Sequence, residues 1–194
     1  MRGSMPFSFQ RDNGARLGVM DRDRNDADVQ WLDIDPCYVF HPVNSYDVGD
    51  HVIIDVARYP SMWEKGSGSF NTKAELWRWD IDTVAGKVTE TQLDDRPIEF
   101  GRIADNRVGL DYQYGYAVSL DVANAETSDS QSGTIVKYDL GADRSSIWNL
   151  GEGRDPGEFV FVGRPETEIE DDGWLIGYVY DRAEERSSLV ILDA

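Results

Sequence analysis

The sequence predicts an all-β protein, and three observations support this fold class. Short runs rich in Val, Ile, Tyr and Trp alternate with turns rich in Gly, Asp, Asn and Pro along nearly all of the 194 residues. No stretch combines a helical period of apolar residues with capping residues. A short pattern also recurs along the chain, which is typical of a β-propeller built from similar blades.

The predicted strands follow one another along the chain, and each is bounded by turn signals such as Asp172-Gly173. Two connections are longer and polar, Pro60–Thr72 and Asn124–Gly133, and loops of that length are usually functional or mobile. The predicted strands are Ala15–Met20, Val29–Ile34, Cys37–His41, His51–Tyr59, Ala74–Ile81, Val88–Leu93, Tyr112–Leu120, Thr134–Leu140, Ser146–Leu150, Glu158–Val162, Trp174–Tyr180 and Ser188–Leu192.

The recurring pattern is an apolar run that ends near an aspartate. Asp80, Asp139 and Asp193 mark three such runs and lie 59 and 54 residues apart. A propeller blade of four strands takes about 40–50 residues, so insertions would lengthen this unit. A β-sandwich would also give many short strands, but it would not give this spacing. Because the chain ends on a predicted strand, we expect an incomplete ring of blades.

Composition indicates one folded domain and argues against two classes of partner. The chain is 40% hydrophobic and has six Trp, which is enough to bury a core. Its net charge of −18 argues against nucleic acid and anionic membrane, because both require clustered Lys and Arg. The single cysteine, Cys37, excludes an internal disulfide and favours a reducing, cytoplasmic location. Met1–Ser4 resembles an expression leader, so we expect the domain over residues 5–194.

One of the two histidines is a candidate metal ligand. His41 ends an apolar, aromatic run and is followed by Pro42, which we expect to stop the strand and turn the chain. Neutral imidazole is a good ligand for iron, copper, nickel and zinc, and the end of a strand would hold it rigidly. A histidine beside an apolar run is also commonly a hydrogen-bonded core residue. His51, at the start of another strand, is expected at the surface.

Two glutamates lie inside apolar strands, where a buried carboxylate needs a partner. They are Glu99 in the segment Pro97–Arg102 and Glu158 in the segment Gly157–Val162. One interpretation is an ion pair with a nearby arginine such as Arg102, or simple exposure at a sheet edge. The other is an acceptor for the ring N–H of a metal-bound histidine, which would fix its tautomer and raise its basicity.

Other motifs give less support for a function. Asp21–Asp28 superficially resembles a calcium loop, but Asp26 stands where the loop needs Gly and Leu32 stands where it needs a bidentate Glu. We interpret the segment as a polar hairpin turn. The chain has no nucleophile elbow, phosphate loop, cysteine pair or zinc-protease helix motif, so the common hydrolase, kinase and zinc functions have no support.

Taken together, these segments resemble the carotenoid cleavage oxygenase family, which includes carotenoid, apocarotenoid and lignostilbene dioxygenases and the retinoid isomerase of vision. The resemblance covers less than half of a typical member. Gly101 and Gly163 stand where the family usually has Pro, and we expect looser turns there; Ser45–Asp47 replaces an Ala-Tyr-Glu pattern. The matching segments are Ala15–Val19, Phe40–Asp47, Glu99–Arg102, Glu158–Val162, Glu170–Leu175 and Leu189–Ala194.

The resemblance implies a fold and a metal site. The fold is a seven-bladed β-propeller, of which this chain would form about three to four blades in an incomplete ring. The metal is a non-haem Fe(II) held by four histidines, three of them oriented by glutamates. His41 matches one iron ligand, and Glu99 and Glu158 match two of the orienting glutamates, although the sequence does not say which glutamate serves which histidine. His51 matches no ligand, and the other ligands would lie outside this chain.

The implied reaction is oxidative cleavage of a conjugated C=C bond by O₂, with a carotenoid, apocarotenoid or stilbene-type molecule as the apolar substrate. Because one histidine cannot hold iron in such a site, we expect the chain to be inactive alone and to self-associate through unpaired strand edges. The resemblance leaves open a peripheral membrane contact of the full-length protein. Two rival interpretations are a non-catalytic β-propeller interaction module and another propeller enzyme, such as a calcium-dependent lactonase.

Overall fold

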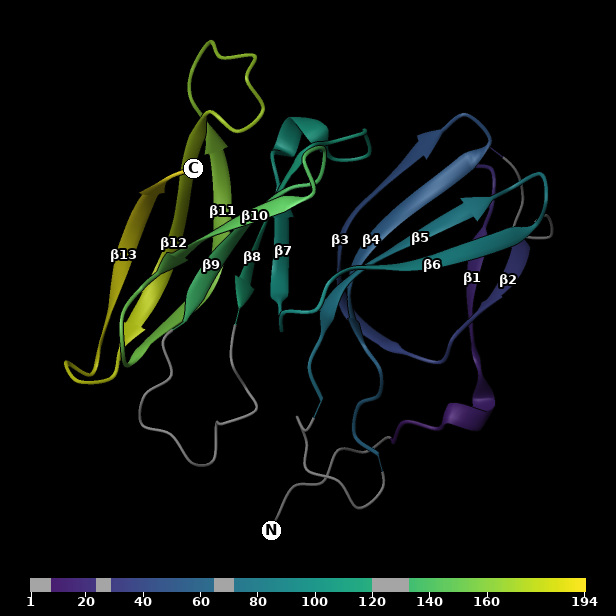
Figure 1. Cartoon of the computed structure of the whole chain (residues 1–194), viewed down its shortest axis with the longest axis horizontal. Coiled ribbons are helices and arrows are strands. Elements are labelled where there is room, and N and C mark those ends of the chain that lie inside the picture. Colours follow the sequence, from purple (N-terminus) through teal and green to yellow (C-terminus); the bar gives the residue numbers. More distant parts are fainter. Residues whose placement is uncertain (1–7, 24–28, 65–71, 120–132) are drawn as a thin grey trace.

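The strands form four antiparallel sheets that stand side by side in the computed structural model (Figure 1). The structure describes residues 8–23, 29–64, 72–119 and 133–194. Those ranges contain no α-helix, and none of their helical segments could cross a membrane. The elements are η1 (Arg11–Asn13), β1 (Ala15–Val19), β2 (Gln30–Ile34), β3 (Tyr38–Val48), β4 (His51–Tyr59), β5 (Glu75–Asp82), β6 (Lys87–Asp94), β7 (Glu99–Ile103), η3 (Asp105–Arg107), β8 (Tyr114–Ser119), β9 (Thr134–Asp139), β10 (Arg144–Asn149), β11 (Arg154–Gly163), β12 (Gly173–Asp181) and β13 (Arg186–Asp193).

Two of the sheets are complete four-stranded meanders, β3-β4-β5-β6 and β7-β8-β9-β10. The pair β1-β2 precedes them and the three-stranded sheet β11-β12-β13 follows them. Four antiparallel strands per sheet is the unit of a propeller blade. The described part of the chain therefore holds two whole blades, three strands of another, and the pair β1-β2 beside β6 in an open arrangement, and the prediction of an all-β, incomplete β-propeller is confirmed.

The first strands of successive blades lie next to one another. β3 packs beside β7, and β7 packs beside β11. Each of these strands is the outermost member of its own sheet on one side, so its free edge faces the neighbouring blades rather than another strand of its own sheet. His41, Glu99 and Glu158 lie on these three strands.

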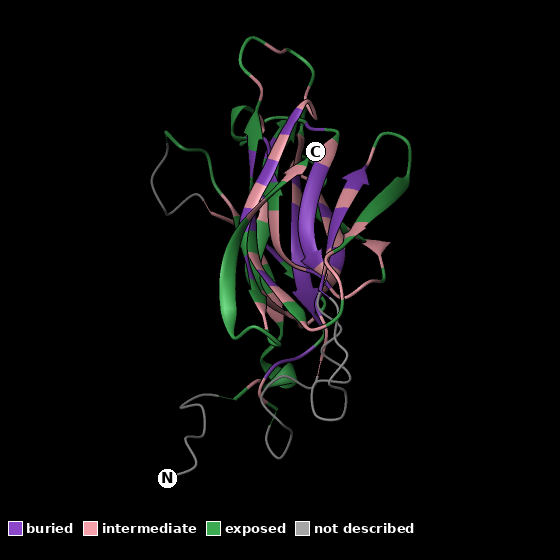
Figure 2. Ribbon diagram, turned by 90° about the vertical axis from the view of Figure 1, so that its left-hand side faces the viewer, coloured by how far each residue is buried: buried purple, intermediate pink, exposed green. Residues whose placement is uncertain are grey.

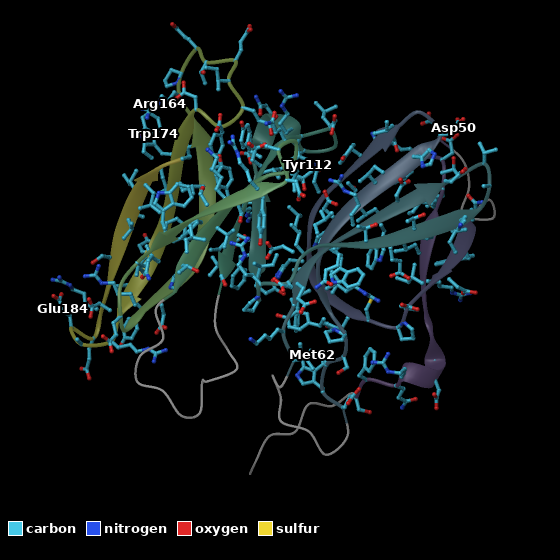
Figure 3. All side chains as sticks on the ribbon, in the orientation of Figure 1. Asp50, Met62, Tyr112, Arg164, Trp174 and Glu184 are labelled. Carbon is cyan, nitrogen blue, oxygen red and sulfur yellow. The ribbon has the colours of Figure 1, made fainter. Side chains whose placement is uncertain are left out.

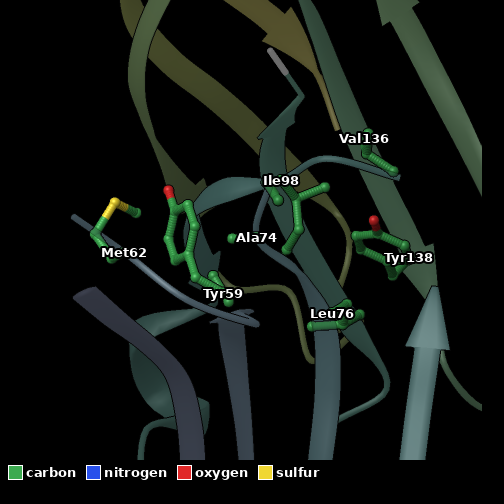
Figure 4. Close-up of a cluster of buried hydrophobic side chains, with 9 residues drawn as sticks. Tyr59, Met62, Ala74, Leu76, Ile98, Val136 and Tyr138 are labelled. Atoms are coloured by element: carbon green, nitrogen blue, oxygen red, sulfur yellow. The ribbon is translucent and has the colours of Figure 1, made fainter. Parts of the chain in front are cut away.

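Hydrophobic side chains fill the spaces between successive sheets. The first interface, shown in Figure 4, joins the β3–β6 blade to the β7–β10 blade and includes Tyr59, Leu76, Ile98 and Val136. The second joins the β7–β10 blade to the last sheet around a second cluster, in which Leu175 is fully buried. Burial is concentrated in the strands at these interfaces, and exposure in the loops and outer strands (Figure 2). The strands of a sheet that is covered on both faces contain near-continuous runs of apolar residues, and this explains the mostly apolar sequence of β4.

Pro42 does not end its strand, so that expectation is wrong. β3 continues to Val48, and Pro42 pairs with Val56 of β4. Proline is tolerated here because β3 is an edge strand, where a missing N–H removes no ladder hydrogen bond on the open side. The register of β3 shifts on both sides of Pro42, so the strand accommodates the ring by bulging instead of stopping.

The aspartate repeat is real in the hairpins, but only Asp139 of the three predicted positions belongs to it. Asp82 takes the place of Asp80, and Asp181 takes the place of Asp193, which ends β13 opposite Trp174. Each aspartate of the repeat begins a four-residue turn and ends the ladder of its hairpin. The Oδ1 atom of Asp82 accepts hydrogen bonds from the backbone N–H groups of Val84 and Ala85. A short carboxylate that bonds the backbone two and three residues ahead explains why aspartate recurs at these turns.

Several sequence expectations fall outside the described residues. They are the leader 1–4, residues 24–28 of the polar turn, residues 65–71 of the first long connection and residues 120–132 around the second.

Candidate metal-ligand site beside an apolar cavity

The structure brings His41 and Glu99 together from two blades. The Nδ1 atom of His41 is 2.7 Å from Oε2 of Glu99, although 58 residues separate them in the chain. An ionised carboxylate only accepts hydrogen bonds, so Nδ1 donates to it and Nε2 keeps its lone pair. The His41 side chain is 49% exposed and that of Glu99 only 12%. The imidazole is thus fixed from behind and open in front, as a metal ligand requires.

A β-bulge lies at each of these two residues. In β3, the pair Phe40–His41 stands opposite Ala57 alone. In β7, the pair Phe100–Gly101 stands opposite Ala117 alone, directly after Glu99. Phe100 has a φ of +55°, which is uncommon for any residue but glycine. Bulges bend a strand and re-aim its side chains. The two irregularities therefore direct His41 and Glu99 toward each other.

Neighbouring groups hold this pair in place. The Oε2 atom of Glu99 also accepts the backbone N–H of Phe100 at 3.0 Å. The His41 ring lies between two phenylalanines, with centroid distances of 6.1 Å to Phe40 and 5.4 Å to Phe100. Burial, and next the negative charge of Glu99, raise the pKa of the Tyr59 hydroxyl. The plane and the tautomer of the imidazole are therefore both constrained.

A cavity of about 330 Å³ opens beside the pair. Its walls are mainly aromatic and aliphatic, and its few polar groups include the imidazole and the carboxylate just described, a composition typical of a ligand pocket. The end of β4 and the residues before β5 both line it, so the first long connection leaves from this end of the blade. The lining residues are Phe40, His41, Tyr59, Thr72, Lys73, Ala74, Pro97, Ile98, Glu99 and Phe100.

Sequence reasoning singled out His41 and Glu99 but missed most of this wall. Phe40 and Phe100 each stand directly beside a predicted site residue, and that adjacency was the available signal. Tyr59 and Ile98 gave no signal, because they reach the cavity from a strand end and a linker whose positions depend on the packing of two blades.

Glu158 does not join the pair. It lies on β11, and its Oε1 atom is 2.5 Å from Nη2 of Arg102 on β7, with both side chains nearly half exposed. In this chain Glu158 therefore makes the arginine ion pair that was one of its two interpretations. An ion pair this exposed contributes about 0–1 kcal/mol to stability.

His51 lies away from the site, at the surface. Its Nδ1 atom is 2.5 Å from Oδ1 of Asp80, and its side chain is 44% exposed. The hydrogen bond to Asp80 raises the pKa of this histidine. The prediction that His51 is a surface residue is confirmed.

The residues at this site fit one coordination position of Fe(II). His41 supplies a neutral imidazole of fixed tautomer, which is a ligand type that iron accepts. Among residues 8–23, 29–64, 72–119 and 133–194, no group of three or more His, Cys, Asp or Glu side chains could hold a metal ion. His41 is thus the one site imidazole whose chemistry fits an iron ligand among the described residues, and they contain no carboxylate cluster of the kind that calcium needs.

The two glycines that depart from the family pattern behave differently. A Cβ atom built on Gly101 would lie 2.5 Å from Cγ2 of Val43, so the backbone approaches that side chain closely. The expectation of a looser turn is wrong at this position. At Gly163 the nearest atom to such a Cβ would be 3.8 Å away, which is an ordinary contact and makes no demand for glycine.

Comparisons with known proteins find related sequences and a related fold. Residues 1–194 match the family described as retinal pigment epithelial membrane protein. The chain is 34% identical over 198 residues to a carotenoid cleavage oxygenase of Mycobacterium tuberculosis, covering 98% of this chain and 39% of that protein. It is 29% identical to the apocarotenoid-15,15'-oxygenase of Synechocystis, covering 96% of this chain and 39% of that protein. The solved structure of cobalt-substituted Synechocystis apocarotenoid oxygenase superimposes with a TM-score of 0.83 at 28% identity, covering 95% of this chain and 39% of that one.

Proposed function

The chain belongs to the retinal pigment epithelial membrane protein family, and on that premise we propose that it forms part of a non-haem Fe(II)-dependent dioxygenase. The proposed reaction cleaves a conjugated C=C bond of a carotenoid, apocarotenoid or stilbene-type substrate with O₂. The chain spans 39% of the length of the relatives named above. We therefore assign the remaining iron ligands to parts of the whole protein that this chain does not include.

The observation that carries the proposal is the hydrogen bond between His41 and Glu99. The nearly buried carboxylate of Glu99 lies 2.7 Å behind the half-exposed ring of His41, whereas the carboxylate that bonds His51 at the surface is itself 42% exposed. A metal-bound histidine needs such a carboxylate, because the carboxylate fixes which nitrogen faces the metal and raises the basicity of that nitrogen. A propeller that served only as an interaction module would gain nothing from this pair.

Each residue of the site has a distinct part in the proposed reaction. His41 holds one position of the metal through Nε2, and Glu99 keeps the proton on Nδ1 so that Nε2 stays available. The apolar walls formed by Phe40, Ile98 and Phe100 bind the conjugated chain and exclude water from it. When bound, iron supplies the redox chemistry by which O₂ reacts with the double bond.

Glu158 is proposed to orient a second ligand histidine that lies outside this chain. Its present partner, Arg102, holds it through an exposed ion pair of small energy. A histidine supplied by the rest of the protein would compete with that arginine at little cost. Glu158 lies on β11, the last of the described inner strands, so we assign this histidine to a part of the propeller that would pack beside β11.

Iron binding in the whole protein tests this assignment. We expect the His41→Ala variant to lose stoichiometric iron and turnover. We expect the Glu99→Gln variant to lose about 10–100-fold in iron affinity, the usual effect of removing a carboxylate behind a ligand histidine. His51→Ala is the matched control and should keep both properties, since His51 bonds only Asp80 at the surface.

The 194-residue chain alone provides the complementary test. With one positioned imidazole, it should bind no iron tightly and should not turn over a carotenoid or a stilbene. Tight stoichiometric iron together with turnover by the isolated chain would contradict the proposal, as would unchanged iron content in the His41→Ala whole protein.

The cellular setting follows from the same proposal. We propose a cytoplasmic protein that touches the membrane periphery only in its full-length form, because a polyene substrate partitions into lipid. Fractionation of cells that express the whole protein tests both statements: the protein should be recovered in the cytoplasm, with a share that salt or mild detergent releases from membranes.

A further inference from the structure

Val43, two residues after His41, contacts Gly101, which is two residues after Glu99. Val43 has no partner on β4, because the register steps from Pro42 directly to Asn44. Gly101 belongs to the bulge of β7. A Cβ built on Gly101 would lie 2.5 Å from Cγ2 and 3.3 Å from Cβ of Val43, and real Cβ atoms essentially never come within 3.0 Å of another atom. The Val43 side chain therefore occupies the space that a side chain at position 101 would need.

We propose that the Val43–Gly101 contact is a spacer that sets the separation of β3 and β7 and thereby positions Glu99 against His41. Two residues of strand span only about 7 Å, so the spacer and the His41–Glu99 pair lie close together along the same two strands. A change in strand separation at the spacer is then transmitted almost fully to the hydrogen bond. Val43 and Gly101 act through Glu99 and are positioning residues.

The size of the effect follows from the distances. Ordinary contact begins at 3.4 Å, so a methyl group at position 101 would require about 0.9 Å of extra room. If β7 moved away from β3 by that amount, the 2.7 Å distance between Nδ1 and Oε2 would grow to about 3.6 Å. A separation of that size is no longer a hydrogen bond.

Val43 cannot easily move aside to make this room. It packs against the apolar cluster between the first two complete blades and also against the smaller cluster of Tyr46, Ile53, Ile103 and Tyr112. Valine is branched at Cβ and has few accessible rotamers. The strands, rather than the side chain, are therefore expected to yield when position 101 is enlarged.

The contribution of the spacer to catalysis rests on the proposed function, but the contact and its test do not. The test uses the 194-residue chain labelled with ¹⁵N-histidine, in which only two histidines can give side-chain N–H signals. At about pH 8, each Nδ1–H bonded to a carboxylate should give a protected, downfield proton signal. His51, bonded to Asp80, serves as an internal reference in the same spectrum.

Four variants separate the outcomes. Glu99→Gln should shift the His41 signal and identify it. Gly101→Ala should abolish the protected His41 signal and leave the His51 signal unchanged. Val43→Ala should keep the His41 signal, and the double variant Val43→Ala with Gly101→Ala should restore it, because the valine methyl groups that oppose the new methyl are gone.

A Gly101→Ala chain that keeps both histidine signals would overturn the proposal. So would a double variant that keeps the His51 signal and still lacks the His41 signal. Gly101→Ala alone could lose both signals because the chain unfolds, and the double variant then distinguishes the two explanations. Recovery of both signals in the double variant supports the spacer, and continued loss of both signals rejects it. None of these results depends on iron, so a failure of the spacer is distinguishable from a failure of the proposed oxygenase function.

Discussion

Removing the hydroxyl of Tyr112 tests a polar link between the first two complete blades. This hydroxyl donates to Oδ2 of Asp55 at 2.7 Å, and Tyr112 lies where the two blades meet (Figure 3). Asp55 is fully buried, and the guanidinium of Arg78 donates to both of its oxygens at 2.7 Å. A buried carboxylate with three good donors is stable only while those donors remain.

The expected loss is about 2 kcal/mol. A hydrogen bond to a charged group contributes about 1.5–3 kcal/mol, and Tyr112→Phe removes this bond while keeping the ring that packs against Tyr46. With a urea m-value of about 2 kcal/mol per molar, the midpoint of unfolding should fall by about 1 M. Tyr178→Phe is the matched control, because Tyr178 is 64% exposed and the change should stay within about 0.5 kcal/mol.

A midpoint for Tyr112→Phe equal to that of Tyr178→Phe would refute the reasoning. Asp55→Ala should lose more, about 3–5 kcal/mol, since it leaves the guanidinium of Arg78 without its carboxylate. In the combined variant of Asp55 and Tyr112 the two losses should not add, because both substitutions remove the same bond. Full additivity would show that the hydroxyl and the carboxylate do not interact.

The buried hydroxyl of Tyr112 also predicts that the stability of the chain falls at alkaline pH. Burial, and next the charge of Asp55, raise the pKa of Tyr112 well above its usual value of 10.0. A group whose pKa is higher in the folded state than in the unfolded state stabilises the fold fully at pH values below its unfolded-state pKa. That stabilisation is lost as pH rises through the folded-state pKa. Above about pH 10, the stability of the wild-type chain should therefore fall more steeply than that of Tyr112→Phe. Parallel curves would contradict the assignment.

Three further predictions concern the last sheet. Leu175→Ala should lower the free energy of unfolding by about 2–5 kcal/mol in urea titrations, because Leu175 is fully buried between the second complete blade and this sheet; a loss below 1 kcal/mol would contradict that burial. The hydrogen bond from the backbone N–H of Glu184, above all, lowers the pKa of Asp181. The stability difference between the wild type and Asp181→Asn should therefore be present at pH 6 and be lost as pH falls through the lowered pKa, and a difference that does not shrink in acid would refute this prediction. Leu189 and Ile191 are 57% and 59% exposed, and their replacement with lysine should reduce self-association of the isolated chain. Light scattering measures this, and a wild-type chain that is already monomeric would refute the prediction.

Most of the strands were predictable because their formation depends mainly on local sequence, but β7 was not among the predicted strands. The predicted run His51–Tyr59 coincides with β4, and Ala15–Met20 differs from β1 by one residue. The end of β3 was not predictable from Pro42, because a proline is tolerated or rejected according to whether the strand lies at an edge, and only the assembled sheet decides that.

The candidate site was predictable in its members but not in its pairing. A histidine at the end of an apolar run and a glutamate inside one are visible in the sequence, and both interpretations of each were stated. Which glutamate serves His41 depends on the packing of β3 beside β7, two strands that no hydrogen-bonded ladder joins. The bulge after Glu99 also left no signal, because Phe100 adopts a left-handed φ at a position where sequence rules would look for glycine.

The position of β7 explains why the described residues contain one His–Glu pair and one Arg–Glu pair. Glu99 reaches back from β7 to His41 on the preceding blade, and Arg102 reaches forward from the same strand to Glu158 on the following one. Site residues are thus paired across blade boundaries rather than within blades. At the boundary of β3 and β7 the partner of the carboxylate is a histidine, and at the boundary of β7 and β11 it is an arginine. The Arg102–Glu158 pair is exposed and contributes only about 0–1 kcal/mol, so under the proposed function a histidine from elsewhere in the whole protein would replace Arg102 at little cost.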